Sequence, residues 1–215
     1  MSLQARMASD TRSEYLDAVF GDVCRSTRCT EERRRAVEEV LQLAVEIARE
    51  GREGRKIGTL FVVGDVEATL TRSRPLLLDP LYGHPPELLH VERPEFRETV
   101  KELAQLDGAF VVDEDGTFAA ACRYIAVDLA APEAFLPGLG TRHAAGASIT
   151  AATQTIAIVV SQSSVVRVFW RGRVRAEIIP ELFLLSREQL FMPHPAVRQL
   201  PEAGITLAVE EDEAA

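Results

Sequence analysis

Gly138–Val160, with the sequence GLGTRHAAGASITAATQTIAIVV, joins a glycine-containing loop to a helix and then to a strand. The residues after Gly140 are mostly small, and we predict a helix over 141–153 that such side chains allow to lie close against a sheet. Ile156–Val160 is an unbroken apolar run, which predicts a strand. This order of elements indicates a domain in which helices and strands are mixed.

The rest of the chain also contains predicted helices and predicted strands. Apolar residues recur at helical spacing from Thr30, which suits an N-cap, to Gly51, which suits a helix stop. A second helix is predicted over 94–106, with Pro94 in its first turn. Strands are predicted over 57–63, 109–112, 117–127, 156–160, 165–170 and 174–179, and an ordered loop over 74–86. The mixture indicates an α/β (mixed α+β) fold in a single domain.

The two ends of the chain differ from the part between them. We assign residues 1–29 to an N-terminal extension, residues 30–190 to the domain and residues 191–215 to a C-terminal tail. The acidic run Glu210–Glu213 in this tail is expected to lie in solvent.

The composition of the 215-residue chain narrows the class of protein. Hydrophobic residues make up 47% of the sequence, as in an ordinary globular domain, and the formal net charge is -9. Because nucleic-acid-binding proteins usually carry a basic face, we expect no nucleic-acid partner. No stretch approaches roughly 18 consecutive apolar residues, and residues 1–10 lack the apolar core of a secretory signal. We therefore expect a cytoplasmic protein without a membrane segment.

Gly140-Thr141-Arg142-His143 is the first candidate site. Backbone N–H groups at the start of a helix bind phosphate, helped by the helix dipole. Thr141 adds a hydroxyl, Arg142 a planar cation, and His143 either a donor or a metal-ligating nitrogen. The alternative interpretation is structural, with Thr141 as the helix N-cap, Arg142 in solvent and His143 packed in the core.

Asp107-Gly108-Ala109 is the second candidate site and lies between a predicted helix and a predicted strand. Small residues let a ligand approach the backbone closely. A carboxylate at this place can hold a metal ion or orient a hydroxyl nucleophile. The alternative is a simple turn that joins the helix to the strand.

Taken together, the two motifs resemble those of the diadenylate cyclase family, the DisA-type nucleotide-binding (DAC) domain. They occur in the family's order, with Ala119–Cys122 between them and Ile158–Ser161 after them. The resemblance implies a twisted mixed β-sheet flanked by helices, with one ATP and Mn²⁺ or Mg²⁺ in each domain. It also implies a homo-oligomer in which two sites face each other. Two ATP molecules then become cyclic di-AMP, because each 3′-hydroxyl attacks the other nucleotide's α-phosphate and releases pyrophosphate.

The resemblance also implies roles for individual residues. Asp107 is the expected catalytic residue, which orients or deprotonates the 3′-hydroxyl, and Asp107 and His143 are the expected metal ligands. Tyr124 and Ile125 lie where family members bind the adenine. The full set of expected nucleotide-binding residues is Gly108, Ala109, Tyr124, Ile125, Gly140, Thr141, Arg142, His143 and Ser161.

The sequence departs from the family pattern in two places. Many members have a second arginine directly after the histidine, where this chain has Ala144. Many also have a Ser-Glu-Glu run where this chain has Ser161-Gln162-Ser163. These changes keep an alternative open, namely a catalytically impaired protein of the same fold that binds ATP or a cyclic dinucleotide as a sensor or scaffold.

A last feature is a group of four arginines on the hairpin predicted over 165–179. They are Arg167, Arg171, Arg173 and Arg175. We interpret them as a solvated edge of the sheet, with a contact to a partner or a second subunit as the alternative.

Overall fold

Helices and strands are mixed along the part of the chain that the computed structural model describes, residues 30–127, 139–179, 195–200 and 205–210. The helices are α2 (Glu31–Glu50), α3 (Val66–Thr71), α4 (Pro94–Leu103) and α5 (Thr141–Ala152), with a short 3-10 helix η1 (Pro86–Leu88). The strands are β1 (Thr59–Val63), β2 (Ser73–Pro75), β3 (Ala109–Val112), β4 (Phe118–Ile125), β5 (Ile156–Val160), β6 (Val166–Trp170), β7 (Arg173–Ile179), β8 (Pro195–Leu200) and β9 (Ile205–Glu210).

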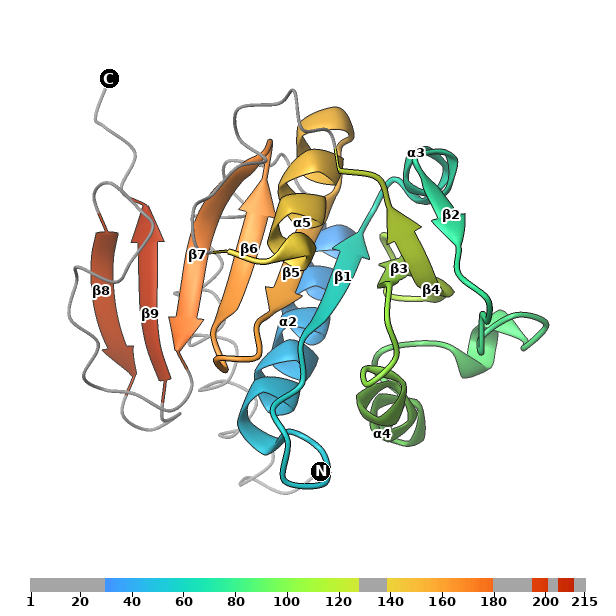
Figure 1. Ribbon diagram of the computed structural model, residues 1–215, viewed down its shortest axis with the longest axis horizontal. Coiled ribbons are helices and arrows are strands. Elements are labelled where there is room, and N and C mark those ends of the chain that lie inside the picture. Colours follow the sequence, from blue (N-terminus) through green and yellow to red (C-terminus); the bar gives the residue numbers. More distant parts are fainter. Residues whose placement is uncertain (1–29, 128–138, 180–194, 201–204, 211–215) are drawn as a thin grey trace.

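All of these strands belong to one open, mixed sheet (Figure 1). They pair in the order β2-β4-β3-β1-β5-β6-β7-β9-β8. The pair β1 and β3 is parallel, and every other neighbouring pair is antiparallel. The expected α/β fold, with a mixed sheet flanked by helices, is therefore confirmed. No helix of the described residues is long and apolar enough to cross a membrane.

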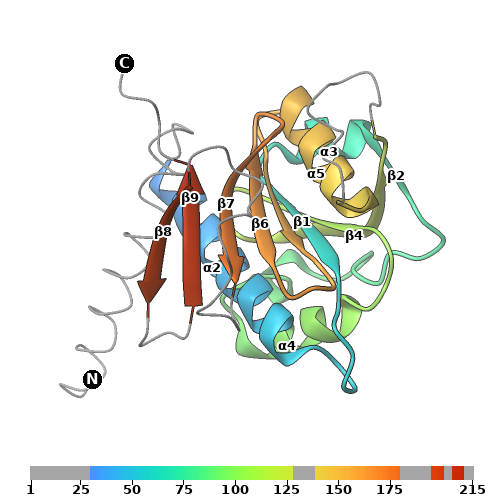
Figure 2. The ribbon, with the colours of Figure 1, turned by 60° about the vertical axis from the view of Figure 1, so that its left-hand side comes forward.

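Two helices cover opposite faces of the central strands, α2 on one face and α5 on the other (Figures 1 and 2). Successive side chains of a strand point to opposite faces. In β1, Phe61 and Val63 belong to the core on the α2 side, whereas Leu60 and Val62 belong to the core on the α5 side. The central strands are buried on both faces, which explains their nearly continuous apolar sequences.

Small side chains let α5 lie close to the sheet, as the sequence indicated. A Cβ atom added to Gly146 would lie 3.1 Å from Cγ2 of Val159 on β5, which is tighter than an ordinary contact. Ala145 and Ala147 on either side of Gly146 are buried in the same core. This contact fixes the position of the helix, and with it the position of the helix N-terminus over the sheet.

The C-terminal segment differs from the sequence prediction. Residues 191–215 were expected to form a tail, but β8 and β9 lie within them and extend the sheet beyond β7. A proline at the first position of a strand is compatible with an edge strand, and β8 begins with Pro195. The short helix α3 and the three-residue strand β2 were also not predicted. The acidic residues 211–213 lie outside the described part of the chain.

The basic hairpin over 165–179 also differs from its prediction. Its strands β6 and β7 lie inside the sheet, because β9 pairs with β7. Arg171 and Arg173 are exposed and Arg175 is half-buried, but Arg167 is only 6% exposed. The interpretation of a solvated edge is therefore wrong for Arg167, which points toward the α5 face together with Phe169.

Gly146→Leu tests how far the fold depends on the close contact between α5 and the sheet. The larger side chain would be forced against Val159, so we expect the free energy of unfolding to fall by about 1–3 kcal/mol in urea denaturation. Ala151→Leu places the same side chain on an exposed position of the same helix and is expected to change stability by less than about 0.5 kcal/mol. Equal effects of the two substitutions would contradict the close packing.

Candidate active site

The N-terminus of α5 lacks a side-chain cap. Gly140 occupies the N-cap position in an extended conformation and makes no side-chain hydrogen bond, and Thr141 is the first helical residue. The helix therefore begins at Thr141, as predicted, and the alternative in which Thr141 is the N-cap is wrong. The first N–H groups of a helix have no acceptor within it, and the first turn of α5 contains no acidic residue that would compete for them. This helix end is suited to binding an anion.

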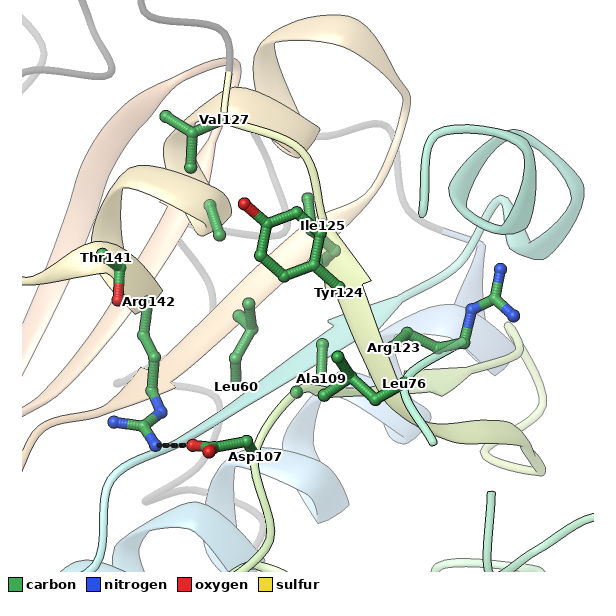
Figure 3. A pocket seen from close by; sticks show the side chains of 12 residues that line it. Leu60, Leu76, Asp107, Ala109, Arg123, Tyr124, Ile125, Val127, Thr141 and Arg142 are labelled. Carbon is green, nitrogen blue, oxygen red and sulfur yellow. Dashed lines mark hydrogen bonds and ion pairs between the residues drawn. The ribbon is translucent and has the colours of Figure 1, made fainter. Parts of the chain in front are cut away.

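Asp107 precedes β3 at a turn that requires glycine at the next position. Gly108 has φ +101°, and a Cβ atom there would lie 2.6 Å from the carbonyl carbon of Cys122 on β4. The Asp107 side chain is 88% exposed, and its Oδ1 lies 3.3 Å from Nη2 of Arg142 (Figure 3). The turn thus brings the carboxylate from the end of α4 to the start of α5.

A cavity of about 410 Å³ lies between these two segments. Leu60, Ala109 and Ile125 give it an apolar surface, and the half-exposed ring of Tyr124 stands over them (Figure 3). The Arg74 guanidinium lies 4.5 Å from the centroid of the Tyr124 ring. An apolar cavity with an aromatic ring and a few polar groups at one end is suited to a flat, partly polar ligand.

A second cavity, of about 350 Å³, lies on the other side of the α5 N-terminus. Its polar groups come from Gly140–His143, from Ser161–Ser163 after β5, and from Arg167 on β6. Thr141 and Arg142 line both cavities. The start of α5 is therefore the point at which an apolar cavity and a polar, cationic cavity meet.

His143 is packed below the second cavity and is only 6% exposed. Its Nε2 lies 3.2 Å from Nη1 of Arg167, and its ring contacts that of Phe169 edge to face. Burial lowers the pKa of His143 to about 4, and the charges of Arg167 and Arg142 act in the same direction. The ring is therefore neutral at physiological pH.

The described residues do not form a metal site by themselves. They contain no group of three or more His, Cys, Asp or Glu side chains that could hold an ion. The two expected ligands line different cavities, Asp107 the first and His143 the second. Asp107 offers an exposed carboxylate, which suits a hard cation that takes most of its other ligands from phosphate and water.

The structure places all of the site residues expected from sequence on one or both of the two cavities. Asp107, Gly108, Ala109, Tyr124 and Ile125 line the first cavity, Gly140, His143 and Ser161 line the second, and Thr141 and Arg142 line both. The lining residues that were not among the predicted site residues are Leu60, Leu76, Arg123, Val127, Leu139, Ala145, Val160, Gln162, Ser163 and Arg167. For Arg167 a signal existed, because a charged residue interrupts an otherwise apolar strand.

The fold and the site define an α/β domain that can bind a phosphate-bearing ligand at the N-terminus of a helix. Residues 46–174 match the model of the DisA bacterial checkpoint controller nucleotide-binding (DAC) family. The chain belongs to this family.

Two relatives are named diadenylate cyclase. One, from Methanocaldococcus jannaschii, is 40% identical over 158 residues, which is 72% of this chain and 49% of the relative. The other, from Haloferax volcanii, is 37% identical over 150 residues, which is 68% of this chain and 54% of the relative. The chain thus spans about half the length of these relatives. Among solved structures, it is similar to DacA from Staphylococcus aureus, at 20% identity and a TM-score of 0.43, over 68% of this chain and 88% of that one.

The buried, neutral state of His143 predicts a pH dependence of stability. Between pH 6.5 and about 4 the unfolded chain takes up a proton at this ring and the folded chain does not, so stability falls as the pH falls. From pH 7 to pH 4.5, the parent should lose about 2–3 kcal/mol more unfolding free energy than His143→Gln, measured in urea. The exposed His84→Gln is expected to follow the parent. Parallel losses in the parent and His143→Gln would show that His143 is protonated in the folded state.

Proposed function

We propose that the protein is a diadenylate cyclase that condenses two ATP into cyclic di-AMP and two pyrophosphate. The observation that carries the proposal is the meeting of two unlike cavities at Thr141 and Arg142. The first cavity is apolar with a carboxylate at its end, which suits the adenine and ribose of a nucleotide. The second cavity is polar and cationic, which suits its phosphates. Membership of the DAC family and the names of the two relatives support the same activity.

In this proposal the adenine lies in the first cavity against Leu60 and Ile125, and the ring of Tyr124 stacks on it. The phosphates lie at the start of α5, against its backbone N–H groups, the Thr141 hydroxyl and the Arg142 guanidinium. Ser161 stands on the far side of the second cavity. Its Oγ lies 2.6 Å from Oγ of Ser163, so the two hydroxyls share a hydrogen bond there.

Asp107 is the proposed catalytic residue. It accepts the proton of the 3′-hydroxyl of one ATP while that oxygen forms a bond to the α-phosphorus of the other ATP. The bond between the α-phosphorus and the bridging oxygen to the β-phosphate breaks, and pyrophosphate leaves with the electron pair. The same step with the two nucleotides exchanged closes the ring. Such transfers depend on positioning and charge neutralisation more than on covalent catalysis.

The ion pair between Asp107 and Arg142 is compatible with this role. It is largely exposed, and such pairs contribute at most about 1 kcal/mol. Phosphate oxygens can therefore replace the carboxylate as partners of Arg142, which leaves Asp107 available to the 3′-hydroxyl.

The cofactor in this proposal is Mn²⁺ or Mg²⁺, with Asp107 as the protein ligand and the phosphates as the others. The cation would neutralise charge on the phosphates during transfer. Because one carboxylate serves one hydroxyl and the ring has two, we also propose a homo-oligomer in which two sites face each other. The cytoplasmic location and the lack of a nucleic-acid partner stay predictions from sequence.

A second candidate is a nucleotide sensor or scaffold without turnover. It is favoured by Gln162 and Ser163, which line the second cavity, the one assigned to the phosphates, and bring no carboxylate to it. Incubation with ATP and Mn²⁺, followed by mass spectrometry of the products, separates the two. Cyclic di-AMP supports the enzyme, whereas bound but unchanged ATP supports the sensor.

Asp107→Asn tests the catalytic assignment. The amide keeps the shape of the side chain but does not accept the proton, so we expect formation of cyclic di-AMP to fall by about 10²–10⁴-fold. ATP binding, measured by titration calorimetry, should change by less than about threefold. Asp113→Asn, on an exposed turn outside the two cavities, is the matched control and should keep the parent rate. A rate for Asp107→Asn within threefold of the parent would rule out the assigned role.

Arg142→Ala tests the proposed position of the phosphates. Removal of a guanidinium that contacts the β- or γ-phosphate should weaken ATP binding by about tenfold or more, and AMP binding much less, because AMP lacks these groups. Calorimetry with both nucleotides measures the difference, with the exposed Arg171→Ala as the control. Equal losses for ATP and AMP would indicate that Arg142 has only a structural role.

A further inference from the structure

A buried ion pair lies directly below the phosphate-side cavity. Arg167 interrupts the apolar strand β6 and shares the α5 face with Phe169, and Glu177 is its direct cross-strand neighbour on β7. The Arg167 Nε donates to Oε1 of Glu177. Arg167 is 6% exposed and Glu177 is completely buried. The strand register therefore places both charges inside the protein, next to the first turn of α5.

Stability alone does not account for such a pair. The desolvation cost of two buried charges often equals or exceeds their mutual attraction, and apolar residues of similar volume often stabilise a protein equally well. The pair also does not stand by itself, because Arg167 contacts His143 through Nη1. Glu177, Arg167 and His143 thus form a chain of contacts from the interior of the sheet to the start of α5.

The contact with Arg167 determines which nitrogen of His143 carries the proton. A guanidinium only donates hydrogen bonds, so Nε2 of His143 must be the acceptor. In a neutral imidazole the proton then lies on Nδ1. This Nδ1 is buried and has no hydrogen-bond partner among the described residues. A buried donor without an acceptor is unfavourable, and a ligand in the adjoining cavity can provide one.

We propose that Arg167, held by Glu177, is a positioning residue that fixes His143 as the tautomer with its proton on Nδ1, ready to donate to a phosphate oxygen. The identity of the acceptor rests on the proposed function, whereas the tautomer does not. A metal-binding imidazole nitrogen must carry no proton. Since one ring nitrogen is protonated and the other accepts from Arg167, His143 acts as a hydrogen-bond donor in place of the metal ligand expected from the family.

The tautomer is measured on the ligand-free chain by ¹⁵N NMR of its four histidines. The signals of His143 are assigned as those that disappear in the His143→Gln variant. In the parent we expect a protonated Nδ1 and an unprotonated Nε2. The double variant Arg167→Met/Glu177→Leu removes both charges together, which avoids an unpaired buried charge, and should shift His143 to mainly the Nε2-protonated form. A protonated Nε2 in the parent, or the same tautomer in a folded double variant, would overturn the proposal.

Arg167→Lys provides a second test if the double variant does not fold. Its ammonium is also only a donor, so a lysine that reaches His143 keeps the parent tautomer, and one that does not reach it gives the Nε2-protonated form. A tautomer change in Arg167→Lys therefore supports the proposal, and so does a retained tautomer whose Nε2 signal still shows an accepted hydrogen bond. A retained tautomer without that bond would overturn it.

The role toward phosphate is tested with the non-reactive analogue α,β-methylene ATP and Mg²⁺. In the parent, the Nδ1 proton signal should move downfield on binding and Nδ1 should stay protonated. The double variant should bind the analogue about tenfold more weakly, with AMP affinity within twofold of the parent. An Nδ1 that loses its proton on binding would instead indicate metal ligation and overturn the donor role. If the parent does not bind the analogue at all, the proposed function fails, while the tautomer of the ligand-free protein remains a separate result.

Discussion

The close contact between α5 and the central strands is the constraint on which the site depends. Gly146 has no side chain to hold the helix away from Val159, and the buried alanines beside it fill the remaining space. The helix position determines where its uncapped N-terminus lies, and Thr141 and Arg142 there line both cavities. A wider separation of helix and sheet would move these donors away from Asp107, whose own position is fixed by the glycine turn before β3.

The contacts from Glu177 to Arg167 and from Arg167 to His143 are a second way in which the sheet positions residues of the site. Strands β5 and β6 are otherwise apolar, as is typical of strands that are covered on both faces. The exception lies on the α5 face, below the cavity that we assign to phosphates. A buried charge pair at that place costs desolvation energy. In our proposal its function is to orient the His143 ring, because Arg167 contacts Nε2 and leaves Nδ1 without a protein partner among the described residues.

Much of this organisation could be predicted from the sequence. Helical periodicity after Thr30, the apolar run before Ser161 and the two glycine-containing motifs lead to the fold class, because they reflect local conformation. Together with the family resemblance, they lead to half of the lining residues. The rest depends on pairing between distant segments. β8 and β9 are short strands that pair with each other, and β9 also pairs with β7. The burial of Arg167 follows from its neighbours, because Glu177 lies opposite it on β7 and His143 of α5 contacts it. The helix predicted to start at Thr141 does so, and Gly140 rather than Thr141 is the N-cap because of its extended backbone conformation.

In the proposed complex, one nucleotide occupies both cavities and bends around the start of α5. A crystal structure of the protein with α,β-methylene ATP and Mg²⁺ tests it most directly. We expect the adenine between Tyr124 and Ile125, the ribose near Asp107, and the phosphates at the N–H groups of Thr141 and Arg142. Phosphates bound away from the α5 N-terminus, or an adenine in the cavity between Gly140 and Ser161, would contradict it.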